Sequence, residues 1–189
     1  MMALVAMGWF LMARSSGRAV HDYRSGPVKS GSRTGTSFPV EPGQVFTFGG
    51  IVLENSGHRS AVLEAIRFQP PLASGMEVVD VEVAGADRKV GYVGTHAEFP
   101  PPLLAAYVHP FRGSEVPPLE SPEGANGIEI VFGFRVTQPG EFGFQRVEVD
   151  YRIGDRRHTV RLEDGFLACA PIADFPDGCR HDEFFDRGE

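Results

Sequence analysis

Alternation of apolar and polar residues dominates the stretch from Gly127 to Leu167. Between residues 128 and 136 every second residue is apolar, and the same period of two returns in residues 146–153 and 156–162. A β-strand sends successive side chains to opposite faces, so each run has one apolar and one polar face. The pattern predicts three consecutive strands that form an antiparallel meander, with one face buried and one face in water.

The residues on each face of the first run follow from this period. The apolar face consists of Ile128, Ile130, Phe132, Phe134 and Val136. Glu129 falls on the opposite face, which the pattern predicts to be solvated. We therefore expect Phe132→Asp to destabilise the fold severely and Glu129→Lys to be tolerated, because burying an unpaired charge is costly and surface changes are not.

Four earlier runs also have strand character, namely Val45–Glu54, Ala61–Phe68, Met76–Ala84 and Lys89–Val93. In the first, the apolar parity changes at Gly49-Gly50, which indicates a β-bulge or a crossing between sheets. The residues expected to point inward in the next two runs are Val62, Ile66, Phe68, Val79, Val81 and Val83.

Residues 98–126 are rich in proline and lack a clear period. A loop of this length is usually functional or loosely ordered. Two interpretations remain open: a partner-binding loop, or a crossover that packs Leu103, Leu104 and Tyr107 over the edge of the sheets.

The composition supports an all-β fold and one domain. With 189 residues, 15 Phe, 23 Gly and 15 Pro, the chain has the composition of many short strands joined by turns. We predict a two-sheet antiparallel β-sandwich over residues 40–168.

The two ends of the chain have different compositions. Residues 1–14 are apolar up to Arg14 and too short to span a bilayer, which predicts a short apolar helix acting as a signal anchor, or part of a transmembrane helix that starts upstream of Met1. The alternative is a buried N-terminal strand. Residues 15–39 have the composition of a flexible linker, and residues 169–189 form an acidic tail.

Cys169 and Cys179 are ten positions apart in this tail. They are either joined in a disulfide that closes a small loop or are two free thiols in a reducing compartment. The export signal at the N-terminus favours the disulfide, and an extracytoplasmic location anchored to the cell membrane.

The candidate chemistry is weak. A net charge of −7 argues against nucleic-acid binding. The ligand-capable residues of the tail lack the spacing of calcium or zinc sites, and no G-x-S-x-G motif marks a nucleophile. His96 with Glu98, beside Tyr107 and His109, is a candidate site in the irregular region, but proximity in sequence does not supply the geometry of a site. We therefore predict no catalytic residue, cofactor or metal ligand.

The run GIEIVFGFRVTQPGEFGFQRVEVDYRIGDRRHTVRL, together with FTFGGIVLENSG, resembles an immunoglobulin-like β-sandwich domain of small envelope-anchored proteins of actinobacterial type. The resemblance covers residues 40–168 and implies the fold and the compartment but no activity.

These features predict a non-enzymatic module outside the membrane, held by its N-terminal segment and acting by contact with an unidentified protein or as an envelope scaffold. The alternatives are an accessory subunit of a membrane complex, and a metal-binding or enzymatic module that uses residues 98–126 or the acidic tail.

Overall fold

The computed structural model describes residues 26–30, 35–85, 87–88, 91–180 and 184–185. These residues form an all-β fold, as predicted, with one short 3₁₀-helix (η1, Ile172–Asp174). The strands are β1 (Val28–Ser30), β2 (Gly35–Pro39), β3 (Val45–Asn55), β4 (Ala61–Gln69), β5 (Met76–Ala84), β6 (Thr95–His96), β7 (Val108–Pro110), β8 (Glu115–Val116), β9 (Ile128–Val136), β10 (Gly140–Phe144), β11 (Arg146–Ile153), β12 (Arg156–Leu162) and β13 (Gly165–Ala170).

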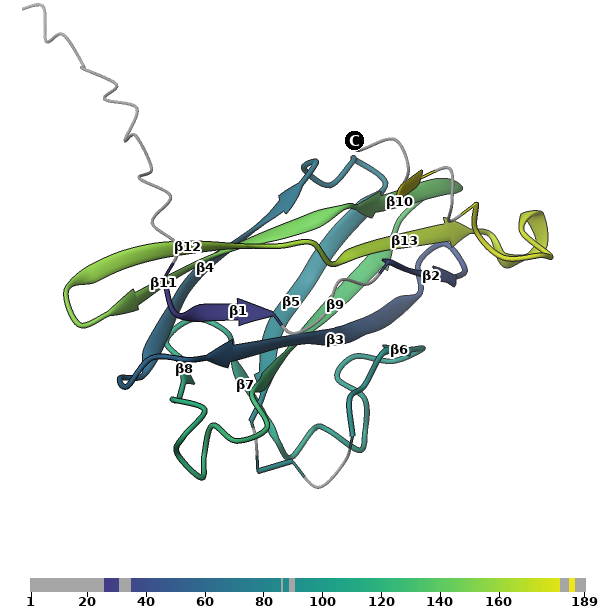
Figure 1. Ribbon diagram of the computed structural model, residues 1–189. Coiled ribbons are helices and arrows are strands. Elements are labelled where there is room, and N and C mark those ends of the chain that lie inside the picture. Colours follow the sequence, from purple (N-terminus) through teal and green to yellow (C-terminus); the bar gives the residue numbers. More distant parts are fainter. Residues whose placement is uncertain (1–25, 31–34, 86, 89–90, 181–183, 186–189) are drawn as a thin grey trace, which may run out of the picture.

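The first layer of the sandwich is a sheet in the order β1-β3-β9-β5-β7, with β6 paired to β3 (Figure 1). Its register changes between Phe48 and Ile51, and Gly50 has a φ of 95°, a conformation that residues with a side chain rarely adopt. The predicted bulge is therefore present. It allows both Phe48 and Ile51 to face the core although their parities differ.

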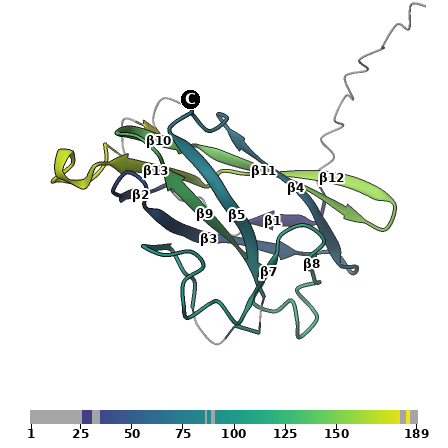
Figure 2. The same ribbon diagram turned by 180° about the vertical axis from the view of Figure 1, so that it is seen from behind.

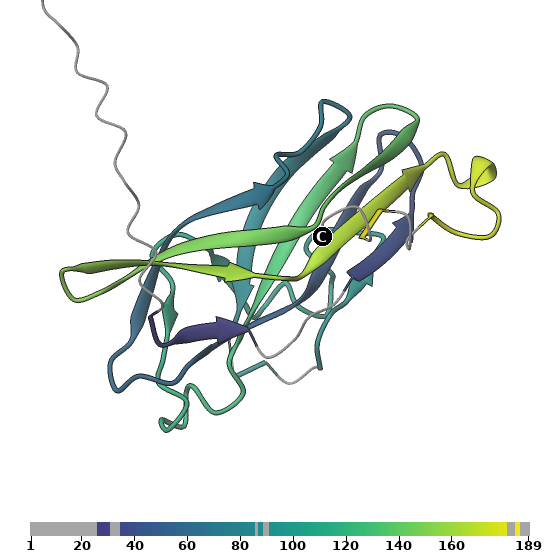
Figure 3. The same cartoon turned by 45° about the horizontal axis from the view of Figure 1, so that its top comes forward.

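The second layer is built on one long hairpin, in which β10 leads into β11 and β12 leads into β13. One half of the hairpin pairs with β4 and β8, in the order β12-β11-β4-β8. The other half forms the order β10-β13-β2, in which β2 is parallel to β13 and all other pairs of the second layer are antiparallel. Figures 1 and 3 show this hairpin crossing over the strands of the first layer.

Phenylalanine side chains fill the space between the layers. The ring centroids of Phe48 and Phe166 are 4.7 Å apart, and those of Phe68 and Phe144 are 4.8 Å apart. Such pairs add to the free energy gained by burying the rings, about 1 kcal/mol per pair. The connected rings of this core are Phe38, Phe46, Phe48, Phe68, Phe132, Phe134, Phe144 and Phe166.

The predicted three-strand meander is only partly present. The hairpin of β11 and β12 is confirmed, with Gly154 at its turn. β9 instead lies between β3 and β5 in the first layer. The physical reason is that β9 is buried on both faces and so occupies the middle of a covered sheet, whereas the alternating pattern predicted one wet face.

The outer face of β11 is polar, as the alternation predicted, and it is organised by ion pairs. Arg67 on β4 pairs with Glu148 and Asp150 on β11, and Arg161 on β12 pairs with Glu148 at 3.2 Å. These cross-strand contacts give the carboxylate of Glu148 two arginine partners although only 4% of its side chain is exposed.

Two predicted boundaries are wrong. β1 and β2 lie within residues 15–39, and Val28 is 2% exposed, so this part of the predicted linker belongs to the sheets. Cys169 lies in β13, so the tail begins after the last strand. Both corrections come from backbone pairing with distant strands.

The predicted N-terminal helix of residues 1–14 lies outside the described residues. No helix among those described has the length and apolar character to cross a membrane.

Bulges also change which residues face the core. In β4, Leu63 is buried at 1% exposure instead of Val62, because the register shifts where β4 passes Asp150 and Tyr151. In β5, Val79 is 43% exposed because a similar shift separates Val78 from Asp80. A strand was predicted for the run Lys89–Val93, but its described residues, 91–93, are not in a strand.

Candidate functional site

The candidate site is an insertion, residues 85–127, which joins β5 to β9 and contains the short strands β6, β7 and β8. Figure 2 shows its loops running from the end of β5 and returning to the start of β9. Binding residues are disproportionately found on loops that a rigid scaffold holds in place. The insertion does two things: it covers the outer face of the first sheet, and it forms a hollow against the start of β9.

Apolar contacts hold the insertion on the sheet. Leu104, at 1% exposure, packs with Ala84 and Val131, and this second cluster also includes Val93, Phe99 and Val108. A Cβ added at Gly133 would lie 2.6 Å from the ring of Phe99, so the missing side chain allows that ring to lie directly on β9. Of the residues expected to pack over the sheet edge, Leu104 is buried, Tyr107 is half-buried and Leu103 is 75% exposed.

Hydrogen bonds provide a second attachment, centred on Glu129. Its Oε1 accepts hydrogen bonds from the backbone N–H of Gly50 at 2.6 Å and of Val93 at 3.0 Å. Glu129 thereby links the bulge of β3 to the insertion. Beside it, Gly49 N–H donates to the carbonyl oxygen of Gly94 at 2.6 Å, and Thr47 Oγ1 donates to the carbonyl oxygen of Glu98.

The side chain of Arg88 completes this polar contact. Its Nε lies 3.7 Å from Oε2 of Glu129, and the side chain is only 5% exposed. Nη1 of Arg88 donates to the carbonyl oxygens of Ala84 and Gly85, and the guanidinium lies 5.0 Å from the ring centroid of Tyr92. The insertion therefore supplies its own cation to a carboxylate of the sheet.

Burial raises the pKa of Glu129, because desolvation disfavours the charged carboxylate. The hydrogen bonds from Val93 and Gly50 and the charge of Arg88 act in the opposite direction and do not cancel it. Glu129 is fully buried, so the expectation that it faces solvent is wrong, and the tolerance expected for Glu129→Lys loses its basis. The cause is the insertion, which covers a face that the local pattern indicates to be wet.

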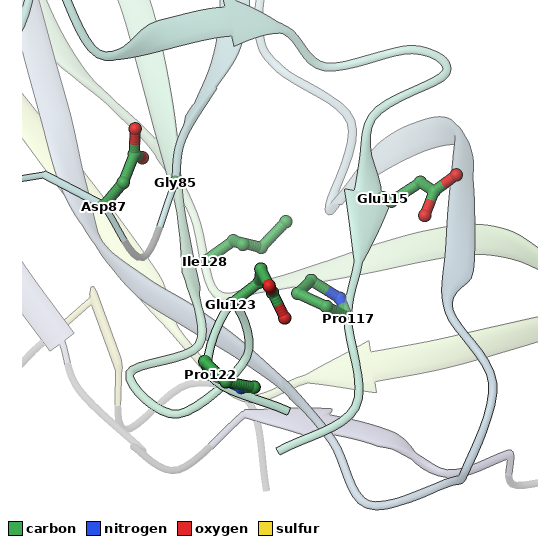
Figure 4. A pocket seen from close by; sticks show the side chains of 7 residues that line it. All are labelled: Gly85, Asp87, Glu115, Pro117, Pro122, Glu123 and Ile128. Atoms are coloured by element: carbon green, nitrogen blue, oxygen red, sulfur yellow. The ribbon is translucent and has the colours of Figure 1, made fainter. Parts of the chain in front are cut away.

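The insertion also forms a hollow, which Figure 4 shows. It has a volume of about 490 Å³. Ile128 lies at its centre, with Pro117 and Glu123 beside it and Asp87 and Glu115 on opposite sides. The remaining lining residues are Gly85 and Pro122. The hollow thus combines an apolar centre with three carboxylates from separate segments of the insertion.

A buried asparagine fixes the position of β8, which forms one wall of the hollow. Nδ2 of Asn55 donates to the carbonyl oxygen of Val116 at 2.9 Å and to that of Arg59 at 2.8 Å. Its Oδ1 accepts from the backbone N–H of Gly57 at 2.9 Å, which closes the turn after β3. One side chain thereby ties the insertion to the turn between β3 and β4.

The other candidate residues are not assembled into a site. His96 lies on β6, which pairs with β3, and His109 lies on β7, which pairs with β5, so the width of the sheet separates them. Cys179 is bonded to Cys169, and Asp174 and Asp177 are exposed. His181, Asp182 and Glu183 of the tail lie outside the described residues. In the part of the chain that the structure describes, no three side chains of His, Cys, Asp or Glu are grouped to hold a metal ion.

The disulfide between Cys169 and Cys179 is confirmed, with the two Cα atoms 5.6 Å apart. Cys169 is fully buried in β13, and the bridge ties the C-terminal segment to the second layer.

The pattern missed Glu129 and Arg88, but the sequence carried a signal for the burial of Glu129. Val131 and Gly133 share the parity of Glu129, so the face predicted to be wet is largely uncharged between Glu129 and Arg135. A strand with apolar or small residues on both faces is typical of a covered sheet.

No protein-family model and no curated protein matches the sequence. Among solved structures, the chain is similar to the VesB protease of Vibrio cholerae, with 8% identity and a TM-score of 0.35, over 76% of this chain and 32% of that one. A non-cellulosomal cohesin from Archaeoglobus fulgidus has 14% identity and a TM-score of 0.31, over 76% and 93%. A family 123 glycoside hydrolase from Clostridium perfringens has 12% identity and a TM-score of 0.30, over 81% and 29%. The chain thus spans about a third of the length of VesB. These low scores assign neither a family nor a function.

Proposed function

We propose that the chain is an immunoglobulin-like module that acts by contact with another protein, through the surface of the insertion. The strand order supports this class. The orders β1-β3-β9-β5 and β4-β11-β12 match the A-B-E-D and C-F-G sheets of that fold. In this class of fold, loops on a rigid sandwich commonly carry the binding function.

The observation that carries the proposal is the way the insertion is built. Apolar and polar contacts attach it to the outer face of the first sheet, so it is held in one shape. It nevertheless exposes two large apolar side chains, Tyr92 at 61% and Leu103 at 75%. A fixed surface with exposed Tyr and Leu and a hollow is suited to a protein partner.

The proposed location is outside the cytoplasm, with the N-terminal segment as the anchor. The disulfide supports an oxidising compartment, and the apolar run of residues 1–13 supports export. Fractionation of cells that make the full chain tests this. Recovery in the soluble cytoplasmic fraction, with both cysteines reduced, would contradict it.

Site-specific photo-crosslinking tests the contact. A crosslinking residue placed at Leu103 should yield a defined adduct in intact cells, and the same residue at Arg156, on the far β11–β12 turn, should yield none. Changing Tyr92 to Ser in the Leu103 probe should reduce the adduct at least fivefold. Equal yields of adduct at positions 103 and 156 would show that the insertion is not the contact surface.

A further inference from the structure

The outer face of the β10-β13-β2 sheet is covered, although the strand pattern leaves it facing away from the core. Phe166, Ala168 and Ala170 of β13 point into the core. Leu167 and Cys169 therefore point outward, yet Leu167 is 1% exposed and Cys169 is fully buried. Something other than the sandwich core covers them.

The cover is the C-terminal segment. We define the strap as its described residues Cys179, Arg180, Phe184 and Phe185. The disulfide joins the strap to Cys169, and Sγ of Cys179 lies 3.8 Å from the carbonyl oxygen of Leu167. Figure 3 shows the path of the chain to this position: after β13 it forms a projecting loop and then returns.

Each end of the strap has its own contact with the sheet. Arg180 donates from its backbone N–H and from Nη2 to the carboxylate of Glu141 on β10, both at 3.2 Å. At the other end, Nε2 of Gln145 donates to the carbonyl oxygen of Phe184 at 2.9 Å. The contacts therefore follow the sheet from its Cys169 end towards its Gly165 end.

The floor under the strap is shaped for an aromatic side chain. A Cβ added at Gly165 would lie 2.2 Å from Cε1 of Phe185, so the ring rests on bare backbone. Across the sheet from Leu167, the neighbouring strands supply Gly143 and Ser37, which are also small. Phe184 packs edge-on against Phe185, with centroids 5.0 Å apart.

We propose that this face is a docking surface for a segment carrying an arginine and a pair of phenylalanines. The chain's own strap is its occupant, and the disulfide holds the strap in place. Glu141 selects the arginine, and Gly165 admits the phenylalanine. The surface lies on the second layer, so the proposal is independent of the contact proposed for the insertion.

Reduction by a dithiol opens the strap. One thiolate of the dithiol attacks Sγ of Cys179, which is the more accessible sulfur, and Cys169 leaves as a thiolate and takes up a proton. The second thiol of the dithiol then resolves the mixed disulfide. Cys179 is released as a thiol, and the dithiol is oxidised to a disulfide. The strap is then held only by its non-covalent contacts.

Alkylation of the reduced, folded full chain tests the role of the disulfide. Once the strap has left, Cys169 should react with iodoacetamide at a rate within tenfold of that of Cys179, while the far-UV circular dichroism stays unchanged. If Cys179 reacts and Cys169 stays protected by a hundredfold or more, the strap remains docked without the bridge, and the proposed control is wrong.

A labelled peptide of residues 176–189, with Cys179→Ser, tests the docking surface. Its target is the full chain with Arg180→Glu and Phe185→Ala, which weaken its own strap and leave the floor unchanged. We expect fluorescence anisotropy to show saturable binding of the peptide to the reduced target. Binding to the oxidised target should be at least tenfold weaker. A peptide with Phe185→Ala should bind the reduced target more weakly by a similar factor. The absence of saturable binding to the reduced, folded target would overturn the docking surface.

Discussion

At the scale of single residues, Glu129 shows how a polar position becomes structural. Its carboxylate links the bulge of β3 to the insertion and lies beside a buried arginine. A carboxylate in this setting is costly to leave unpaired and also costly to replace by a cation.

Glu129→Lys should destabilise the protein by about 3 kcal/mol, because it places a second cation next to Arg88 and removes the acceptor for two backbone N–H groups. Glu129→Gln should cost less, because the amide oxygen keeps an acceptor. Urea denaturation of both variants measures the difference. Equal stability of the lysine variant and the native chain would mean that residue 129 faces solvent.

The stability of the native chain should also depend on pH through Glu129. Its pKa in the folded state is raised above the ordinary value of 4.5, so the folded state binds the proton more tightly than the unfolded state. By linkage, this contribution is fully present below pH 4.5 and is lost as the pH rises through the raised pKa.

Burial also raises the pKa of Glu82, so the Glu129→Gln variant serves as the reference. The free energy of unfolding of the native chain minus that of the variant should fall as the pH rises from 4.5 towards neutrality. If this difference in the free energy of unfolding instead rose over the interval, the pKa of Glu129 would be lowered in the folded state, not raised.

At the scale of elements, β9 organises the molecule because its two faces pack against different layers. One face contributes Phe132 and Phe134 to the phenylalanine core, and the other lies under the insertion. In β5, by contrast, a bulge exposes an apolar residue: it turns Val79 out into solvent.

The same substitution at Phe132 and Val79 separates these two environments. Phe132→Asp should cost more than about 4 kcal/mol or prevent folding, because it buries an unpaired charge among aromatic rings. Val79→Asp should stay within about 0.5 kcal/mol, since that side chain is 43% exposed. Chemical denaturation checks both. A large loss for Val79→Asp would place that residue in the core, as its parity alone predicts.

At the scale of the whole molecule, the disulfide and the phenylalanine core stabilise different parts. The bridge closes a short loop outside the space between the layers, whereas the aromatic rings join the two sheets. The bridge is thus not part of the contact between the two sheets.

Replacing both Cys169 and Cys179 by Ser should lower the free energy of unfolding by roughly 2–3 kcal/mol, the loop-entropy value for a loop of this length, and leave the β-sheet circular dichroism unchanged. Denaturant unfolding and circular dichroism of the double variant measure the two effects. Loss of the β-sheet signal at 25 °C would show that the bridge is needed for the sandwich itself.

The sequence by itself determined the period of the strands, the bulge at Gly49-Gly50, the hairpin at Gly154 and the pair of cysteines. These features depend on neighbouring residues, through side-chain alternation, backbone conformation and short loop closure. Local physics is enough to specify them.

Only the tertiary structure decided which strands pair and which faces are covered. β9 leaves the predicted meander, and β1 and β2 join sheets from within the predicted linker. The insertion buries the face of β9 that the alternation indicated to be exposed, and the strap covers the outer face of β13. Burial of Glu129 and Leu167 depends on segments distant in the sequence or beyond a projecting loop. A period of two within one strand carries no information about what packs on either face.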